Sequence, residues 1–207
     1  TQEHSSAASD VYKRQAYNTS NTTMWEVDFR STSRSANPGK CMAVVVGETL
    51  YFDADASTHG RELWAHNHAN QTTWMVKDFR TSNYHHQLRD GNPGCLGMSG
   101  VVVGDTFYFS ATTPYTIGNG ELWAHNTSNH STWLVADIIP GITGASQPGY
   151  RLAVVIGDTI YFDANDGGTS SQTVRDLWAY DTSNKTTWEV YNFSLSDDYI
   201  HSDALLL

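Results

Sequence analysis

One phrase recurs three times in this chain and constrains its fold more than any other feature. An acidic residue followed by Leu-Trp-Ala occurs in segments 61–67, 120–126 and 175–181, and a second Trp follows each first Trp ten positions later. A unit of this length cannot bury its own hydrophobic face, so such units must stack against one another. The sequence therefore predicts a repeat architecture.

A β-hairpin is predicted in the first half of each unit. Segments 44–52, 101–109 and 154–162 place β-branched and aromatic residues on either side of a Gly-Glu or Gly-Asp pair. Glycine at the first loop position fits a two-residue type II′ turn, because φ is positive there.

A second hairpin is predicted in the other half of each unit. It pairs the Leu-Trp-Ala strand with a Thr-Trp-x-Val strand through a turn rich in Asn, Ser and Thr, whose side chains bond back to turn amides. With a symmetric register, we expect the two Trp of a unit to face each other on one side of the sheet. Their regular recurrence favours core packing over a sugar-stacking surface.

These hairpins together predict an all-β fold. We expect a β-propeller-like array of four-stranded antiparallel blades with about three and a half repeats, as a fragment of a larger propeller or repeat protein. The expected units are residues 16–67, 68–126 and 127–181, a partial unit at 182–195, and a partial or frayed C-terminal segment at 196–207.

Residues 1–15 are expected to lie outside the fold. Segment 5–15 reads as a translated sequencing-library adapter, and Gln15 stands where the repeat requires Trp. From Ala16 onward the chain matches residues 179–188 of the last repeat. We therefore interpret residues 1–15 as a non-native, adapter-derived or disordered segment.

The charge of the chain excludes two classes of partner. The formal net charge is −10 and no cluster of Lys or Arg interrupts it. Nucleic acids and anionic membranes are bound through dense positive patches, so neither is an expected partner. The apolar runs are also much shorter than a membrane-spanning helix, which argues against membrane insertion.

The repeated segments resemble a known group of proteins. Glu-Leu-Trp, a turn, and then Val76-x-Asp78 or Val135-x-Asp137 are similar to the ELWxxDGT repeat family of secreted and cell-surface proteins. The hairpins and the Leu-Trp-x-Tyr-Asp segment also resemble kelch propeller blades. The resemblance implies an extracellular or cell-surface location. However, the Asp-Gly-Thr of the family is replaced at 67–69, 126–128 and 181–183.

A residue present in every unit is usually architectural, and one present in a single unit is a better candidate for a site. The recurring Glu62, Glu121 and Asp176 are therefore expected to cap turn amides or to pair between units, rather than to act as catalytic carboxylates. Residues in the unrepeated loops are the candidates for ligand binding: His85, His86, Arg89, Asp90 and Tyr115. No residue is assigned a catalytic role.

No cofactor is expected, with calcium as the one alternative. Asp53 and Asp55, and Asp163 and Asp166, lie at predicted strand ends in oxygen-rich loops, and calcium is bound by such oxygens. Turn capping is the commoner use of aspartate.

The two cysteines leave two readings open. Cys41 and Cys95 precede predicted strands of consecutive units, where neighbouring blades bring them close enough for a disulfide. Two free, partly buried thiols are the alternative.

Acceptor triplets for N-glycosylation recur in the same turn of every unit. Asn-x-Ser/Thr begins at Asn21, Asn70, Asn129 and Asn184, and also at Asn126 and Asn192. A hairpin tip on a secreted protein is a suitable acceptor. The alternative is that Asn and Thr are simply good turn residues.

The function expected from these features is that of a non-catalytic extracellular repeat module. It binds a protein or glycan ligand through its loops, or builds a surface layer or fibre, with self-association through open blade edges as one mode of assembly. The alternative is a carbohydrate-active enzyme, a glycan hydrolase or lyase, on a propeller scaffold.

Overall fold

A computed structural model shows the fold of the chain. It describes residues 36–56, 59–79, 90–112, 120–139, 146–165, 167 and 175–193, together with the backbone of residues 15–18 and 23–26. These residues form fourteen β-strands and contain no helix.

Twelve of the strands form three four-stranded sheets. The first sheet contains β3 (Ala43–Val46), β4 (Thr49–Ala56), β5 (Gly60–Asn67) and β6 (Thr72–Lys77). The second contains β7 (Val101–Val103), β8 (Thr106–Thr112), β9 (Gly120–Asn126) and β10 (Ser131–Ala136). The third contains β11 (Ala153–Ile156), β12 (Thr159–Ala164), β13 (Asp176–Asp181) and β14 (Thr186–Tyr191). A two-stranded sheet of β1 (Gln15–Asn18) and β2 (Thr23–Glu26) precedes them.

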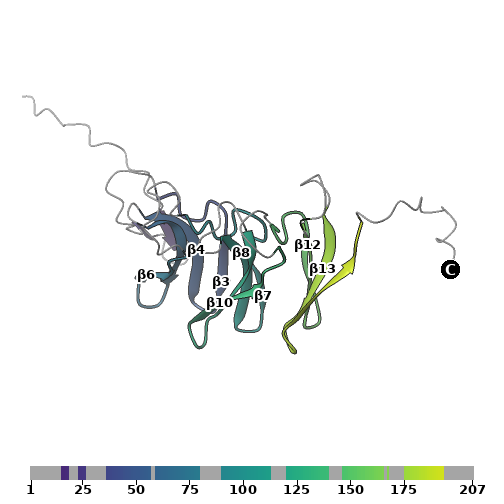
Figure 1. Ribbon diagram of the computed structural model, residues 1–207. Coiled ribbons are helices and arrows are strands. Elements are labelled where there is room, and N and C mark those ends of the chain that lie inside the picture. Colours follow the sequence, from purple (N-terminus) through teal and green to yellow (C-terminus); the bar gives the residue numbers. More distant parts are fainter. Residues whose placement is uncertain are drawn as a thin grey trace, which may run out of the picture.

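The sheets follow one another in chain order. Within each sheet, strands adjacent in sequence pair antiparallel, and the three sheets lie side by side (Figure 1). The first strands of consecutive sheets contact one another, as β3 does β7 and β7 does β11. The predicted fold class, an all-β propeller-like array of four-stranded antiparallel blades, is confirmed.

The boundaries of the predicted units do not coincide with the boundaries of the sheets. The unit boundaries after residues 67, 126 and 181 fall in the turn between the third and fourth strands of each sheet. Each sheet therefore takes three strands from one unit and the fourth from the next. Gln15 of β1, expected to lie outside the fold, pairs with Glu26 of β2, because strand pairing uses backbone groups and does not require a Trp at that position.

Glycine produces the tight turns of the first hairpins. Val46 pairs with Thr49, so the loop has two residues, and its first residue, Gly47, has a φ of 59°. Gly104 and Gly157 occupy the same position with φ of 58° and 60°. The predicted two-residue turns with glycine at positive φ are therefore confirmed.

The expected pairing of the two Trp residues is wrong. Trp64 lies opposite Met75, and Trp74 lies opposite Ala65. The turn between these strands holds the four residues 68–71, so its midpoint falls between two residues, and two Trp ten positions apart cannot be opposite. Because a shift of one residue moves a side chain to the other face, the two Trp of a sheet lie on opposite faces.

This register places two Trp in each gap between sheets, one from each of the two sheets that border the gap. We call the face of a sheet that packs on the following sheet its front face, and the face that packs on the preceding sheet its rear face. Trp74 and Trp133 lie on front faces, whereas Trp123 and Trp178 lie on rear faces.

The core consists of two layers between the three sheets. Between the first and second sheets, Tyr51 packs on Phe107 with ring centroids 4.8 Å apart, and Phe79 meets Trp123 edge-on at 5.0 Å. Between the second and third, Tyr108 packs on Tyr180, next to Phe162. Burial of one such aromatic side chain contributes about 1.5–3 kcal/mol, so the packing between sheets stabilises the fold.

Across the described residues, no helical segment has the length and apolar character needed to cross a bilayer.

Candidate functional site

The connections of the sheets fall into two groups at opposite ends of the strands. At one end, called the turn end, lie the short turns at 47–48 and 68–71 and their counterparts. A hydrogen bond from His68 N to Glu48 O joins these two turns, and Thr127 N to Asp105 O and Thr182 N to Asp158 O join the others. The opposite end, called the loop end, carries the connection between the second and third strands of each sheet and the connections between sheets.

Length differs between repeats only at the loop end. The turns at the turn end have the same length in all three sheets. At the loop end, β4 is followed by β5 after three residues, β8 by β9 after seven and β12 by β13 after eleven. Loops that vary on a constant scaffold are the usual place for recognition, so the loop end is the candidate functional site.

The recurring carboxylates are structural parts of this end. Glu62 is fully buried and accepts hydrogen bonds from the backbone N–H of Phe79 (2.9 Å) and of Gly91 (3.1 Å). Phe79 lies where the connection to the second sheet leaves the first, and Gly91 lies where it arrives. Glu62 therefore holds both ends of this connection.

Glu121 repeats the arrangement in the second sheet. It accepts hydrogen bonds from Ile138 N (3.0 Å) and from the hydroxyl of Ser146 (2.7 Å), the two ends of the next connection. In the third sheet Asp176 accepts a hydrogen bond from Phe193 N at 2.7 Å. The prediction that these carboxylates cap amides is confirmed for all three.

Burial changes the acidity of two of these groups. Loss of solvation raises the pKa of Glu62 to about 9, partly opposed by the N–H of Phe79, with the charges of Asp78 and Asp90 raising it further. Burial raises the pKa of Glu121 to about 7, opposed by its bonds to Ser146 and Ile138. Such values occur in catalytic acids, but both groups are buried and engaged with the backbone, so neither side chain can reach a substrate.

Two buried ion pairs support the same end. Asp53 accepts hydrogen bonds from the N–H of Cys41 and Met42, both at 2.9 Å, and its second oxygen is bound by Arg61. Arg61 also donates to Asn37 O. Each pair therefore ties the start of a sheet to its second and third strands.

The third sheet repeats this pair and the second does not. Asp163 accepts from Arg151 N and Leu152 N and is bound by Arg175, which also donates to Gln147 O. In the second sheet, Ser110 and Gly120 occupy the positions that are equivalent to Asp53 and Arg61. The acid and the base are therefore both present or both absent, as expected of a buried pair in which either charge alone is costly.

The sequence offers two pairs of aspartates as calcium ligands, Asp53 with Asp55 and Asp163 with Asp166. Asp53 and Asp163 belong to different sheets, and both oxygens of each are engaged with backbone N–H groups and an arginine. Asp55 is half-buried in β4, and Asp166 lies outside the described residues. The calcium alternative stays an untested prediction.

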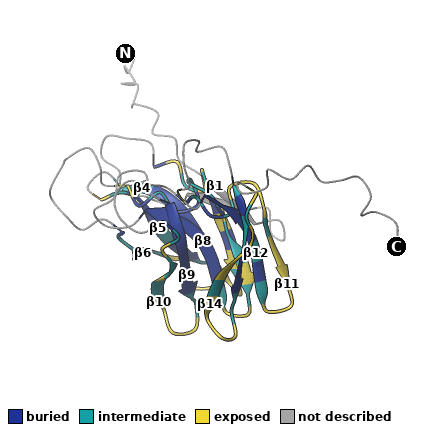
Figure 2. Ribbon diagram, turned by 45° about the vertical axis from the view of Figure 1, so that its right-hand side comes forward, coloured by how far each residue is buried: buried dark blue, intermediate teal, exposed yellow. Residues whose placement is uncertain are grey.

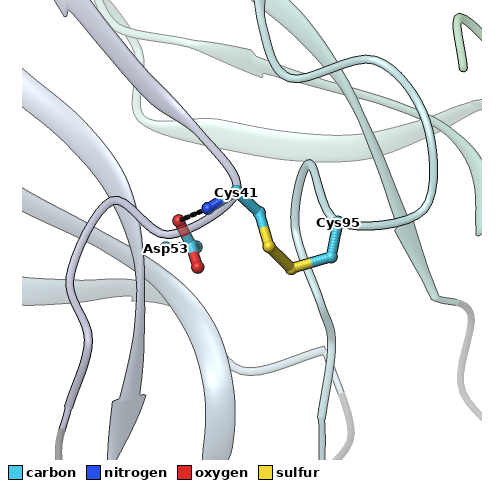
Figure 3. Close-up of side chains that lie close together, drawn as sticks. All are labelled: Cys41, Asp53 and Cys95. Atoms are coloured by element: carbon cyan, nitrogen blue, oxygen red, sulfur yellow. Dashed lines mark hydrogen bonds between the residues drawn. A yellow bond between two sulfur atoms is a disulfide. The ribbon is translucent and has the colours of Figure 1, made fainter.

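The two cysteines form a disulfide. Cys41 and Cys95 are bonded with their Cα atoms 4.8 Å apart, which joins the first and second sheets (Figure 3). Of the two readings left open by the sequence, the structure contains the disulfide. Among the described residues, one group of three potential metal ligands occurs, namely Cys41, Asp53 and Cys95, and the disulfide occupies two of its three members.

Among the predicted ligand-binding residues, Asp90 alone is described. Its side chain accepts a hydrogen bond from Arg61 N at 2.9 Å, and its carbonyl accepts one from the hydroxyl of Thr112. Asp90 thus anchors the end of its loop. His85, His86, Arg89 and Tyr115 lie outside the described residues.

The predicted glycosylation positions divide into two kinds. Asn70, Asn129 and Asn184 are exposed at the turn end, and the side-chain oxygen of each accepts hydrogen bonds from the N–H and hydroxyl of the Thr or Ser two residues later. Asn126 is half-buried, and its carboxamide binds Thr106, Ser128 and Asn129. Asn192 is half-buried and Asn21 lies outside the described residues.

Sequence reasoning missed the role of two histidines. The Nδ1 atoms of His66 and His125 lie 2.8 Å from the hydroxyls of Thr73 and Thr132. Burial lowers the pKa of His66, and it lowers that of His125 to about 4, so His125 is neutral near pH 7. It also packs against Tyr51 across the gap between sheets. The recurrence of these histidines after Leu-Trp-Ala was the sequence signal that could have indicated a structural role.

Comparisons with known proteins give structural similarity alone. No protein-family model matches the sequence, and no curated protein matches it. TolB from Acinetobacter baumannii is similar over 86% of this chain and 37% of its own length, with a TM-score of 0.48 and 14% identity. A puromycin-hydrolysing peptidase from Mycobacterium tuberculosis is similar over 82% of this chain and 22% of its own, with a TM-score of 0.46 and 11% identity.

The tricorn protease is similar over 87% of this chain and 19% of its own length, with a TM-score of 0.37 and 14% identity. The chain therefore spans less than two-fifths of the length of each of these proteins.

Proposed function

We propose that this chain is a non-catalytic extracellular repeat module that binds a protein or glycan ligand through its loop end. The observation that carries the proposal is the contrast between the two ends of the sheets. All variation in the length of the connections lies at the loop end, while the scaffold beneath it repeats.

The chemistry of the recurring carboxylates supports a binding role. Glu62, Glu121 and Asp176 hold backbone amides, and Asp53 and Asp163 are neutralised by arginines. These acids stabilise the base of the loops, where they keep the ends of the connections in place. A rigid base reduces the entropy lost when a loop binds its ligand.

The extracellular location rests on covalent chemistry. A disulfide joins Cys41 to Cys95, and disulfides persist in oxidising compartments. The exposed acceptor triplets at Asn70, Asn129 and Asn184 agree with a secreted protein, as does the similarity to the ELWxxDGT repeat family. The net charge of −10 favours a neutral or basic ligand over a polyanion.

A glycan array combined with an array of extracellular proteins tests this function, with the full chain as the probe. In one variant, residues 84–89 are replaced by a Gly/Ser segment of equal length, which leaves the anchor Asp90 in place. In the matched control, the turn 68–71 is replaced by residues 127–130, the equivalent turn of the second sheet.

We expect the loop variant to lose the binding that the original chain shows and the control to keep it. Equal binding by both variants would place recognition away from the loop 84–89 and contradict the proposal for that loop. Release of cleaved sugar from any bound glycan would instead support the carbohydrate-active enzyme.

A further inference from the structure

The front face of the third sheet is apolar and exposed. Leu152 has 39% of its surface exposed, whereas its counterparts Met42 and Met98 have 2% and 1%. The three are equivalent because the carbonyl of each accepts a hydrogen bond from the N–H of Asp53, Ser110 or Asp163 at the same point of the sheet. One position in the repeat is thus core in two sheets and surface in the third.

The other front-face positions show the same difference. Val154 is 43% exposed where Val44 is 7%, and Phe193 is 53% exposed where Phe79 is 1%. Ile156, Trp188 and Val190 are exposed as well, although Val46, Trp74 and Val76 pack against the core. Figure 2 shows this contrast as the exposed colouring of β11 and β14. Six apolar side chains therefore form one continuous exposed surface.

The recurring carboxylates Glu62, Glu121 and Asp176 differ in how their second partner is supplied. In the first sheet, Glu62 binds the departing Phe79 with one oxygen and the arriving Gly91 with the other. Glu121 binds the departing Ile138 and the arriving Ser146, both through Oε2, and its Oε1 has no partner among the described residues.

Asp176 lacks the second half of this arrangement. Its Oδ1 binds the departing Phe193, whereas its buried Oδ2 has no partner in the described part of the chain. A buried unpaired carboxylate oxygen is costly, and at the equivalent sites the second partner is a donor at the start of the following sheet. Among the described residues, Asp176 thus lacks the donor from a following sheet that Glu62 and Glu121 each have, and the exposed front face lacks the same kind of neighbour.

The two equivalent faces show which kind of surface fits here. The front face of the first sheet is covered by Phe107, Phe109, Ala111 and Trp123 of the next rear face. That of the second is covered by Ile160, Phe162, Ala164 and Trp178. Both rear faces present an apolar-x-Phe-x-Ala strand next to a Trp, and we propose that the front face of the third sheet is an interaction surface for another sheet of this repeat. That partner also supplies a hydrogen-bond donor to Asp176 Oδ2.

An extended chain tests this inference without a partner in hand. Residues 1–193 are followed by a second copy of residues 80–139, so that the copied connection follows Phe193 as it follows its counterpart Phe79. The readout is hydroxyl-radical oxidation of Trp188, measured by mass spectrometry, with Trp74 as the internal reference for a covered Trp. The control carries Phe107→Ser and Phe109→Ser in the appended copy alone.

We expect the oxidation rate of Trp188 to fall to that of Trp74 in the extended chain and to stay high in the control. If the oxidation rate of Trp188 in the extended chain is unchanged, the inference is overturned. This holds whether or not circular dichroism shows that the appended strands have formed. In the original chain, Trp188 could instead become protected as the protein concentration rises, with a doubled mass by light scattering. That result would assign the face to a second copy of the chain and would also overturn the inference. None of these readouts depends on ligand binding at the loop end.

Discussion

Single buried side chains determine how this chain responds to pH and to substitution. Glu62 and Glu121 hold the connections between sheets, and Asp53 and Asp163 hold the starts of sheets. All four are buried, so their contributions depend on partners that have been removed from water with them. Two consequences can be measured.

The first concerns the proton on Glu62. Its folded pKa of about 9 lies above the ordinary value of 4.5, so this group's stabilisation is complete below pH 4.5 and is lost as the pH rises towards 9. We expect the free energy of unfolding to fall between pH 7 and 9 by up to about 1.4 kcal/mol per pH unit. Urea unfolding of the original chain and of Glu62→Gln, which cannot ionise, should show the slope in the former only.

Glu48→Gln is the control for that experiment, because Glu48 is exposed in a turn and its substitution should leave the slope intact. The window above pH 7 avoids His125, whose lowered pKa gives the opposite effect, a loss of stability as the pH falls from 6.5 towards 4. An equal slope in Glu62→Gln would show that another group carries the dependence.

The second consequence concerns the buried pair of Asp53 and Arg61. Arg61→Gly leaves a buried charge without its partner and should cost about 3–5 kcal/mol in unfolding free energy. The double variant Asp53→Ser with Arg61→Gly reproduces the Ser110 and Gly120 combination of the second sheet. We expect it to cost less than the sum of the single variants, with a coupling energy of about 2 kcal/mol by urea unfolding. Additive losses would contradict the coupling.

Among the structural elements, the hairpins carry the most sequence information. In each sheet the first hairpin has a glycine turn and the last has a polar four-residue turn whose final residue has positive φ, namely Gln71, His130 or Lys185. In all three sheets the two kinds of turn lie next to each other at the turn end, joined by a backbone hydrogen bond. Their properties can therefore be tested one turn at a time.

Gly47→Ala tests the first kind of turn. No atom lies within 4 Å of a Cβ at this position, so any effect comes from the positive φ of 59° rather than from a clash. We expect a loss of about 1 kcal/mol in unfolding free energy and a lower Tm. Glu48→Ala, at the neighbouring loop position, should have almost no effect, and an equal loss there would refute the conformational explanation.

The polar turns contain the predicted glycosylation positions. We predict that a chain secreted from eukaryotic cells gains glycan mass at Asn70, Asn129 and Asn184, which are exposed and correctly paired with the following Thr or Ser. Asn126 should remain unmodified, because Thr106, Ser128 and Asn129 already engage its carboxamide. Peptide mapping before and after glycosidase treatment checks each position, and the absence of any mass change would refute the prediction.

Between the sheets, one covalent bond adds to the apolar layers. The disulfide of Cys41 and Cys95 closes a segment of 54 residues, for which loop-closure entropy predicts about 4 kcal/mol of stabilisation. We expect a reducing agent to lower the unfolding free energy of the original chain by about this amount and to leave Cys41→Ala with Cys95→Ala unchanged. An original chain indifferent to reductant would show that the bond contributes little.

Much of the architecture was predictable because it is encoded locally. The glycine turns, the polar turns and the alternating hairpins follow from residues adjacent in sequence, and the repetition of the pattern implied stacked sheets. The structural role of Glu62 and its counterparts was also predictable, because a residue present in every unit serves what every unit shares. The joint absence of acid and base at Ser110 and Gly120 was visible in the sequence but was not recognised.

The remaining features depended on non-local contacts. The faces of Trp64 and Trp74 were decided by a turn of four rather than three or five residues, because a shift of one residue reverses every side chain. The disulfide required two sheets to meet, and the anchoring role of Asp90 required Arg61 to lie beside it.

By itself, the sequence determined the repeat, the strands and their turns, since these depend on periodicity and on backbone preferences of neighbouring residues. Tertiary packing decided which apolar face of each sheet is core and which is surface. Leu152 and Met42 are equivalent in the repeat, yet one is exposed and the other buried. Burial is a property of what lies opposite a side chain, and no local pattern can specify it.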